Sequence, residues 1–320
     1  MSTLDLKDKK ILYELDLNAR QSNSQIAKKV RLNKNTVNYK IKRLEENKVI
    51  LSYYAVIDST KLGYFSFRVY LNFFNTVPIQ EKEMIDWLKA KGEISVIGVI
   101  ETIYDLVFMF MAKNVYEFDD FWLEFKKRFR KYFWNEKVDV FTKVSHFKRK
   151  YLLGSEKYEK YEAIGDNIPA KYDELDIKIL MMLTENARMP LINISKKLKA
   201  SPRTIAFRMK QLEKKRIILG YRVNINLQSI GYEYYKINMT LNDFEKYDSL
   251  MNFSKNHPNI IYIDRTLSDL DFEIDVGIKG KPELLELINE IKLKFNIRKV
   301  EMYSYKEYIK LDSMPNLVHK

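Results

Sequence analysis

The sequence predicts an α+β protein built from two tandem copies of one two-part unit. Three observations predict this fold class: a gapless internal repeat, three short amphipathic helices at the start of each copy, and a β-α-β-β-α-β order of patterns in the rest of each copy. With 320 residues, the chain is about twice the usual size of a domain. Each copy is therefore long enough to bury a core of its own.

The internal repeat covers residues 4–64 and 172–232, an offset of 168 residues (172 minus 4). About a third of the aligned positions are identical, and the alignment needs no gap. The identical pairs include Asp8/Asp176, Asn18/Asn186, Arg20/Arg188, Thr36/Thr204 and Leu44/Leu212. A match of this length in one register indicates that a single unit is present twice.

Each copy opens with three helical patterns in quick succession. In the first copy they cover residues 8–17, 24–30 and 34–47. A three-residue turn precedes the third helix, and Asn33 or Ser201 stands where it can cap that helix. Pro202 follows at the helical position that tolerates proline best. This spacing predicts a helix-turn-helix in each copy, followed by strands at residues 51–58 and 219–226.

The rest of each copy alternates strand and helix patterns. In the first copy these cover residues 65–74, 79–91, 94–101, 106–112, 116–132 and 138–148, and in the second 234–241, 244–256, 260–266, 272–278, 282–295 and 298–309. The order predicts a four-stranded antiparallel sheet with both helices on one face, the ferredoxin-like βαββαβ arrangement. Because the strands carry aromatic and aliphatic residues, we expect a partner sheet to cover the other face.

These patterns divide the chain into five parts. We expect winged helix-turn-helix domains at residues 1–62 and 172–230, ferredoxin-like domains at 63–153 and 231–320, and a linker at 154–171. The linker is polar and charged and contains Gly154, Gly165 and Pro169. Its Glu-Tyr-Lys repetition around residues 156–162 favours a solvated helix or a flexible spacer.

Composition narrows the function classes. The 56 Lys and Arg residues exceed the 43 Asp and Glu residues, and the net charge of +13 favours a polyanionic partner such as nucleic acid. The absence of cysteine excludes disulfide scaffolds, cysteine-based zinc sites, iron–sulfur clusters and thiol nucleophiles. The first residues lack the apolar core of a signal peptide, and the apolar stretches are too short to cross a bilayer. We therefore expect a cytoplasmic protein with no membrane partner.

Two motifs resemble those of the Lrp/AsnC family of transcription regulators. The pattern L-D-x-x-D-x-x-I-L-x-x-L-x-x-[ND]-[AG]-R is met by residues 4–20 and again by 173–188. The pattern T-[VI]-x-x-[RK]-[IM]-x-x-L-E is met by residues 36–45 and 204–213. The resemblance covers nearly the whole chain outside the linker. It implies DNA-binding winged helix-turn-helix domains, each followed by a ferredoxin-like effector and oligomerisation domain, with the unusual feature of two full units on one chain.

The third helix of each helix-turn-helix is the expected reading element for double-stranded DNA. Arg and Lys pair with guanine edges or phosphates, Asn and Gln with adenine, and aromatic side chains pack against thymine methyl groups. The expected DNA-contacting residues are Lys34, Asn35, Asn38, Tyr39, Lys42, Arg203, Thr204, Phe207, Arg208 and Gln211. The alternative interpretation is a solvated helix face, in which most of these side chains touch only phosphate or water.

The resemblance also implies an effector site at the turn between the second and third strands of the ferredoxin-like domain. The family pattern there is Gly-x-[YF]-Asp. The candidate residues are Thr102, Tyr104 and Asp105 in the first copy and Ser268 and Asp271 in the second. Neither copy has the glycine, which would permit close approach of a ligand, so the alternative is an aspartate that only stabilises a tight hairpin.

The fusion suggests why two copies are present. One chain can imitate the two-fold dimer that the family forms from two chains. The two reading helices differ in sequence, so we predict an asymmetric pair of half-sites about one helical turn or a multiple apart. Whole chains could self-associate further through any sheet edges that remain open.

No motif in the sequence points to an enzyme, a cofactor or a metal site. His146, His257 and His319 lie far apart and lack metal-ligand spacing. Two alternatives stay open. Fused proteins that resemble this family include sirohaem decarboxylases, which carry His and Arg near the second strand of the ferredoxin-like domain, whereas residues 94–108 contain neither. The other alternative is an architectural protein that coats DNA with little sequence preference.

Overall fold

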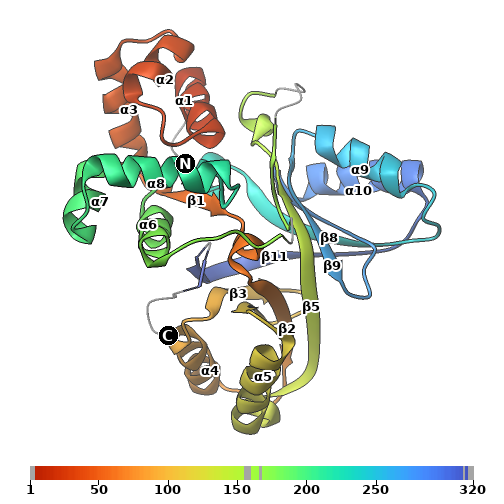
Figure 1. The fold of residues 1–320 in the computed structure, drawn as a ribbon. Helices are drawn as coiled ribbons and strands as arrows, with labels where there is room; N and C mark the ends of the chain where they lie inside the picture. Colours follow the sequence, from red (N-terminus) through yellow and green to blue (C-terminus); the bar gives the residue numbers. More distant parts are fainter. Residues whose placement is uncertain (1–3, 155–159, 166–167, 313, 316–320) are drawn as a thin grey trace.

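A computed structural model describes residues 4–154, 160–165, 168–312 and 314–315. It has the predicted α+β architecture, with two winged helix-turn-helix domains at one end and two α/β layers below and beside them (Figure 1). In the first copy the elements are α1 (Leu6–Leu17), α2 (Asn23–Val30), α3 (Lys34–Glu46), β1 (Ile50–Ile57), η1 (Ser59–Leu62), β2 (Phe65–Phe73), α4 (Pro78–Ala90), β3 (Ile94–Glu101), β4 (Leu106–Ala112), α5 (Val115–Phe129), η2 (Arg130–Tyr132) and β5 (Phe133–His146).

The second copy repeats this order after a connecting segment. The connection holds η3 (Lys150–Leu152) and β6 (Glu162–Ile164). The second copy comprises α6 (Glu174–Glu185), α7 (Leu191–Leu198), α8 (Pro202–Lys214), β7 (Ile218–Ile225), η4 (Gln228–Ile230), β8 (Glu233–Leu241), α9 (Tyr247–Asn256), β9 (Ile260–Leu267), β10 (Phe272–Ile278), α10 (Lys281–Phe295) and β11 (Ile297–Leu311). The main departure in length is β5, which begins five residues before the expected strand (138 minus 133) because Phe133 already pairs with Phe73 of β2.

The two winged helix-turn-helix domains meet through a two-stranded antiparallel sheet, β1 with β7. In this ladder Tyr54 lies opposite Arg222, which is its own equivalent in the repeat (54 plus 168 equals 222). Equivalent residues that face each other mark a local two-fold axis through the ladder. One hydrophobic core, which includes Ile11, Val37, Ile179 and Ile205, runs through both domains.

The two ferredoxin-like sheets join edge to edge and close on themselves. Within the copies the strand orders are β5-β2-β4-β3 and β11-β8-β10-β9, as the βαββαβ pattern predicts. Between the copies β3 pairs with β11 and β5 pairs with β9. These pairings engage the edges of both sheets within one chain, so the expected association of whole chains would need edges other than those of β3, β5, β9 and β11.

The helices cover the outer faces of the two sheets. α4 and α5 pack on the first sheet over an aromatic core that includes Phe108, Phe121 and Phe125. α9 and α10 pack on the second sheet over an aliphatic core that includes Ile274 and Leu287. The partner sheet expected over the other face is therefore the second copy of the same chain, and the side chains between the sheets are enclosed from both sides.

The interior between the sheets is more polar than the sequence led us to expect. It holds six buried charged residues: Arg68, Asp139, Lys236, Asp264, Glu273 and Asp275. Arg68 donates to Asp139 at 2.8 Å and pairs with Asp264 at 3.2 Å and with Glu273. Lys236 lies 2.6 Å from Asp264. The expectation of an apolar face was wrong here, because the two buried cations share buried carboxylate partners that come from both copies.

The segment expected as a linker also takes part in the fold. Its strand β6 pairs with the end of β5, with Glu162 opposite His146. The Glu162 carboxylate forms a nearly buried ion pair with Lys148. In the part of this segment that the structure describes, the expectation of a solvated spacer is therefore wrong at β6.

Candidate nucleic-acid interface

α3 and α8 are capped at the positions predicted from the sequence. The Asn33 side chain accepts from the Thr36 N–H at 2.7 Å, and the Ser201 hydroxyl accepts from the Thr204 N–H at 3.0 Å. Each cap satisfies an amide that the first helical turn leaves unpaired. The buried faces are also equivalent, since Val37, Ile41 and Leu44 correspond to Ile205, Met209 and Leu212. The two helices therefore present the same face to solvent.

Most of the predicted DNA-contacting residues lie on these solvent faces. The exposed ones are Lys34, Asn35, Asn38, Tyr39, Lys42, Arg203, Thr204 and Phe207. Tyr39 and Phe207 occupy equivalent positions and are 66% and 59% exposed. Large exposed aromatic side chains at the centre of a polar, basic helix face are typical of a binding surface.

Arg208 does not lie on the free face. Its guanidinium pairs with Asp173 at 2.7 Å and with Asp176 at 3.4 Å, both at the start of α6. The Asp176 N–H and then Arg208 lower the pKa of Asp173. The guanidinium therefore braces α8 against α6, and the predicted base contact of Arg208 has to compete with these two ion pairs.

The first copy has the same brace. Lys40, the equivalent of Arg208, pairs with Asp5 at 2.6 Å and with Asp8 at 3.0 Å. Arg43 adds a second ion pair to Asp8 at 2.6 Å. Gln211 occupies the position of Arg43 and is half-buried, so it sits at the border of the solvent face. Helical periodicity identified the polar side of the third helix. It did not identify which residues on that side form ion pairs with the first helix of the same domain.

Reciprocal backbone contacts hold the two helix-turn-helix domains together. The Ala19 N–H donates to the Tyr221 carbonyl at 2.8 Å, and the Ala187 N–H donates to the Tyr53 carbonyl at 2.8 Å. Each domain thus places the end of its first helix against the strand of the other. The relative position of α3 and α8 is fixed by these backbone bonds as well as by the β1–β7 ladder.

Arginine side chains cross the same junction in both directions. Arg20 donates to the carbonyl groups of Ala187 and Met189, and Arg188 donates to the Ala19 carbonyl at 2.8 Å. Each guanidinium also lies over a tyrosine of the opposite domain, Arg20 over Tyr221 and Arg188 over Tyr53. The sequence motif that ends in this arginine therefore serves the junction between the copies.

An asymmetric charged cluster joins the helix-turn-helix pair to the large sheet. Asp16, at the end of α1, is fully buried and accepts from the Arg149 N–H at 2.8 Å and from Arg222 Nη2 at 2.7 Å. Burial opposes ionisation of Asp16, but Arg222 and Arg149 outweigh it and lower its pKa to about 2. The equivalent residue in the second copy is Thr184, so this link exists on one side only.

The predicted effector turns are held by bonds within the protein. The Asp105 carboxylate accepts from the Phe73 N–H at 2.7 Å, and that of Asp271 accepts from the Leu241 N–H at 2.7 Å. These bonds match the hairpin-stabilising interpretation of both aspartates. Tyr104 stacks on Tyr70 with ring centroids 4.5 Å apart.

The two turns differ in backbone conformation. Thr102, which stands where the family has glycine, has φ of +100°, and its hydroxyl donates to the Met302 carbonyl at 3.3 Å. Ser268, its counterpart, instead accepts from the Leu270 N–H at 3.1 Å. The first copy therefore keeps the glycine conformation with a threonine, which costs about 1–3 kcal/mol.

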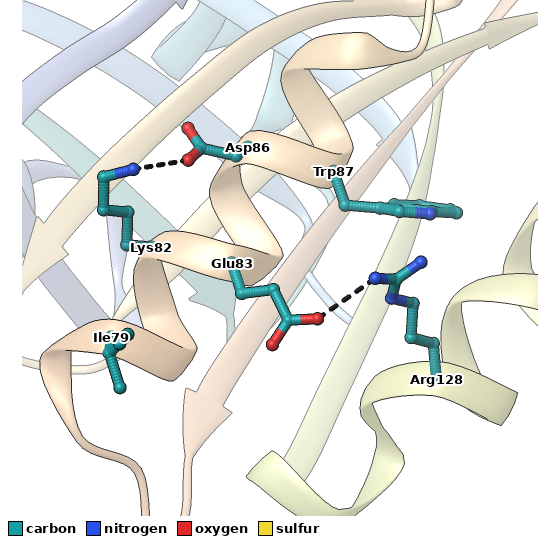
Figure 2. A pocket seen from close by; sticks show the side chains of 6 residues that line it. All are labelled: Ile79, Lys82, Glu83, Asp86, Trp87 and Arg128. Atoms are coloured by element: carbon teal, nitrogen blue, oxygen red, sulfur yellow. Dashed lines mark hydrogen bonds and ion pairs between the residues drawn. The ribbon is translucent and has the colours of Figure 1, made fainter.

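One further surface feature lies outside the helix-turn-helix domains, on the first ferredoxin-like domain. A hollow between α4 and α5 is lined by Ile79, Lys82, Glu83, Asp86, Trp87 and Arg128 (Figure 2). Its charged groups are already paired, Lys82 with Asp86 at 2.7 Å and Arg128 with Glu83 at 3.1 Å. Within the described residues, no group of three or more acidic or histidine side chains could hold a metal ion.

The described residues include two of the three histidines, His146 and His257. His146 is enclosed, and burial together with nearby cations lowers its pKa to about 3. It is therefore neutral at physiological pH and is not poised for proton transfer. His319 lies outside the described residues. In the described part of the chain, no helix is long and apolar enough to cross a membrane.

Comparison with known proteins agrees with this geometry. The profile described as winged helix-turn-helix DNA-binding matches residues 4–50 and 172–218, one segment in each copy. An uncharacterized HTH-type transcriptional regulator of Pyrococcus furiosus is 29% identical over 121 residues, which cover 38% of this chain and 80% of the relative. The HTH-type transcriptional regulator LrpA of Pyrococcus horikoshii is 45% identical over 60 residues, which cover 19% of this chain and 43% of LrpA.

The chain is therefore a DNA-binding protein with two winged helix-turn-helix domains. The two helix-turn-helix matches and the similarity to HTH-type transcriptional regulators agree with the resemblance of the sequence motifs to the Lrp/AsnC family.

A solved structure extends the likeness of fold to almost the whole chain. The siroheme decarboxylase NirDL is 15% identical, with a TM-score of 0.64, and the match covers 96% of this chain and 93% of NirDL. At this identity the likeness concerns the fold alone. It agrees with the observed arrangement of two winged helix-turn-helix domains and two ferredoxin-like domains.

Proposed function

We propose that the protein is a sequence-specific DNA-binding transcription regulator, not an enzyme, and that one chain acts as a pseudo-dimer reading two half-sites. Such a regulator acts in the cytoplasm, where it meets the chromosome. The observation that carries the proposal is the β1–β7 ladder centred on Tyr54 and Arg222, with reciprocal bonds on both sides. A local two-fold junction of this kind supports the proposal, because helix-turn-helix dimers present two reading helices related by a two-fold axis.

The exposed residues of α3 and α8 suit the major groove. Lys42 and Arg203 are exposed cations on the two helices, and Asn35 and Asn38 are exposed amides on α3. The half-sites should differ, because the residues equivalent to Asn35 and Asn38 are Arg203 and Ala206. An asymmetric operator with half-site centres about 34–36 Å apart, or a multiple of that, is the expected target.

Selection of bound fragments from genomic DNA, followed by fluorescence-anisotropy titration, tests the function. Lys42→Ala and Arg203→Ala should each weaken binding about 5- to 100-fold if the side chain reads a base. Lys82→Ala is the matched control, since this exposed lysine lies on α4, away from both reading helices (Figure 1). Equal affinity of the parent for a selected and a scrambled duplex would favour the architectural alternative.

The mass of the protein–DNA complex and the footprint of the protein on DNA test the pseudo-dimer. We expect one chain per operator, with two protected segments of different sequence. Two chains bound to a perfect palindrome, each copy paired with its own equivalent, would contradict the proposal. Affinity should also fall steeply with salt, because Lys and Arg contacts to phosphate release counterions.

The enzyme alternative has one observation in its favour, the fold shared with siroheme decarboxylase NirDL. Against it, residues 94–108 contain no His or Arg, and the solvent faces of α3 and α8 carry DNA-compatible residues. Absorbance after incubation with sirohaem, followed by gel filtration, distinguishes the two functions. A bound tetrapyrrole would support the enzyme.

We infer that neither ferredoxin-like turn binds a common amino acid strongly. Asp105 and Asp271, the two acidic candidates, are both engaged by backbone N–H groups of their own sheet. A thermal-shift screen of all twenty amino acids checks this inference. A ligand at a hundred times its dissociation constant adds about 2.7 kcal/mol of stability, so a clear upward shift would contradict it.

A further inference from the structure

A chain of polar side chains runs from the second copy to the reading helix of the first. Arg188, which follows α6, donates from Nη2 to Asn23 Oδ1 at 2.7 Å. Asn23 is the first residue of α2, and its Nδ2 donates in turn to Oδ1 of Asn38 on α3. Arg188 and Asn23 are half-buried, whereas Asn38 is exposed on the reading face.

The direction of both hydrogen bonds is dictated by chemistry. A guanidinium has only donors, so Asn23 must present its carbonyl oxygen to Arg188. The NH₂ group of Asn23 then faces Asn38, which must accept this hydrogen bond with its own carbonyl oxygen. One lone pair of the Asn38 carbonyl oxygen is thereby occupied and the amide is held in one orientation, with both hydrogens of its NH₂ group left for DNA. Arg188 is itself held by the Ala19 carbonyl at 2.8 Å and by the Tyr53 ring, so the first link is anchored.

An asparagine with both ends free pairs with adenine through two bonds, using its NH₂ and its carbonyl together. Resting on the proposed function, we propose that this fixed amide orientation makes the NH₂ group of Asn38 the leading contact with DNA, selecting an acceptor edge such as guanine N7/O6 or thymine O4. Asn23 and Arg188 are the positioning residues for this selection. They act through Asn38 and need no contact with a base.

The second copy has no equivalent of this device. Leu191 stands at the position of Asn23, and Ala206 at that of Asn38. Arg20, the counterpart of Arg188, donates to the backbone carbonyl groups of Ala187 and Met189. The selection by the oriented Asn38 amide therefore belongs to one half-site, and it gives the chain a means to bind an asymmetric operator in a single orientation.

Asn23→Asp reverses the last bond of the chain without removing the first. A carboxylate only accepts, so it still accepts from Arg188 but forces Asn38 to turn its NH₂ inward and its carbonyl toward the groove. We expect the preferred base at one position of the α3 half-site to change from an acceptor edge to a donor edge, such as adenine N6 or cytosine N4, with a change in preference of about tenfold or more. Affinities for duplexes with each of the four bases at every position measure this ratio.

The double variant Asn23→Asp/Asn38→Ala is the control. The added negative charge weakens binding to all duplexes alike, but the ratio between bases should then equal that of Asn38→Ala alone. An unchanged ratio in Asn23→Asp would overturn the proposal. The proposal would also be overturned if the double variant showed the same change of ratio as Asn23→Asp. In that case the side chain at position 23 would contact the base itself.

The same titrations separate this proposal from the proposed function. If Lys42→Ala and Arg203→Ala weaken binding while Asn23→Asp keeps the parental base ratio, only the positioning chain is wrong. If the parent shows no preference among duplexes, the regulator itself is wrong and the positioning chain with it. Thermal unfolding of each variant checks that the helix-turn-helix pair remains folded.

Discussion

The two interfaces between the copies have diverged to different degrees. At the helix-turn-helix junction, contacts come in matching pairs: Tyr53 donates to Glu45 at 2.6 Å, and Tyr221 donates to Glu213 at 2.7 Å. Between the sheets the two halves no longer match. Only the cations correspond, since Arg68 and Lys236 occupy equivalent positions in β2 and β8.

The carboxylates in the sheet interior come mainly from the second copy. Asp275 lies beside Lys236 in the ladder, where Met109 lies beside Arg68. Asp264 and Glu273 correspond to Gly98 and Val107. A symmetric dimer must place the same residue on both sides of its axis, but a fused chain does not. The junction that positions the reading helices keeps the symmetry, and the enclosed interior has lost it.

The largest expected effect tests the interior. Arg68→Met removes the cation that faces Asp139, Asp264 and Glu273, so that Lys236 is left as the cation paired with Asp264 and Glu273 and Asp139 loses its buried guanidinium partner, and it should cost about 3–5 kcal/mol of unfolding free energy. Urea denaturation measures the loss. Arg128→Met, which breaks an exposed ion pair, should cost less than about 1 kcal/mol. A similarly small loss for Arg68→Met would mean that the interior carboxylates do not depend on this cation.

The second effect is a pH dependence that comes from Asp275 in the second copy. Burial, with Asp264 adding to it, raises the pKa of Asp275 to about 7 from its ordinary 3.8, although Lys236 opposes the shift. Because the folded-state pKa is raised, the stability from protonated Asp275 is present below about pH 4 and is lost as the pH rises toward 7.

Asp275→Asn should remove this loss, a difference on the order of 2–4 kcal/mol across that range. Denaturation of parent and variant at about pH 4.5, 6 and 7.5 measures this difference in unfolding free energy. Carboxyl groups with lowered pKa act in the opposite sense. The pKa of Glu273 is held at about 2 because Arg68 and Lys236 outweigh burial, so its contribution is lost only as the pH falls below its ordinary 4.5. Parallel pH curves for parent and Asp275→Asn would show that Asp275 ionises normally.

A smaller effect tests the symmetry of the helix-turn-helix junction. Burial, and then the neighbouring glutamate, raises the pKa of Tyr53 and likewise that of Tyr221. Tyr53→Phe and Tyr221→Phe each remove one hydrogen bond to a carboxylate and should each cost about 1 kcal/mol. Calorimetry of the two variants should give the same loss. Unequal losses would show that the two halves of the junction are not energetically equivalent.

The smallest effect distinguishes the two turns by its sign. Thr102→Gly relieves a positive φ and should stabilise the chain by up to about 1 kcal/mol, less the weak bond from its hydroxyl. Ser268→Gly should destabilise slightly, because Ser268 is not among the residues with positive φ and its hydroxyl accepts a turn bond. Melting temperatures of both variants provide the comparison. Shifts of the same sign would contradict the assigned difference in strain.

Local patterns predicted the helix-turn-helix domains well because their signals lie close together in the chain. Asn33 and Ser201 cap the helices that the turn spacing predicts, and the order of strands follows from the β-α-β-β-α-β pattern. Periodicity placed Arg208 on a helix face but did not reveal its acidic partner Asp173, 35 positions earlier.

The charged interior could be anticipated only in part. Arg68 and Lys236 stand out as cations in otherwise apolar strands, separated by the same offset of 168 residues as the repeat (236 minus 68). Their partners depend on pairings such as β5 with β9, which join distant segments. The Arg188–Asn23–Asn38 chain was likewise invisible, because it crosses between the copies.

Closure of the sheet has a consequence for synthesis of the chain. β3 ends at residue 101, and its partner β11 begins at residue 297, so 196 residues (297 minus 101) separate them. At 5–20 residues per second, a ribosome leaves the outer edge of β3 exposed for roughly 10 to 40 s. An unpaired edge is a template for pairing with another nascent chain. The mature molecule protects its edges, but the first half must wait for the second, and that interval is when aggregation is most expected.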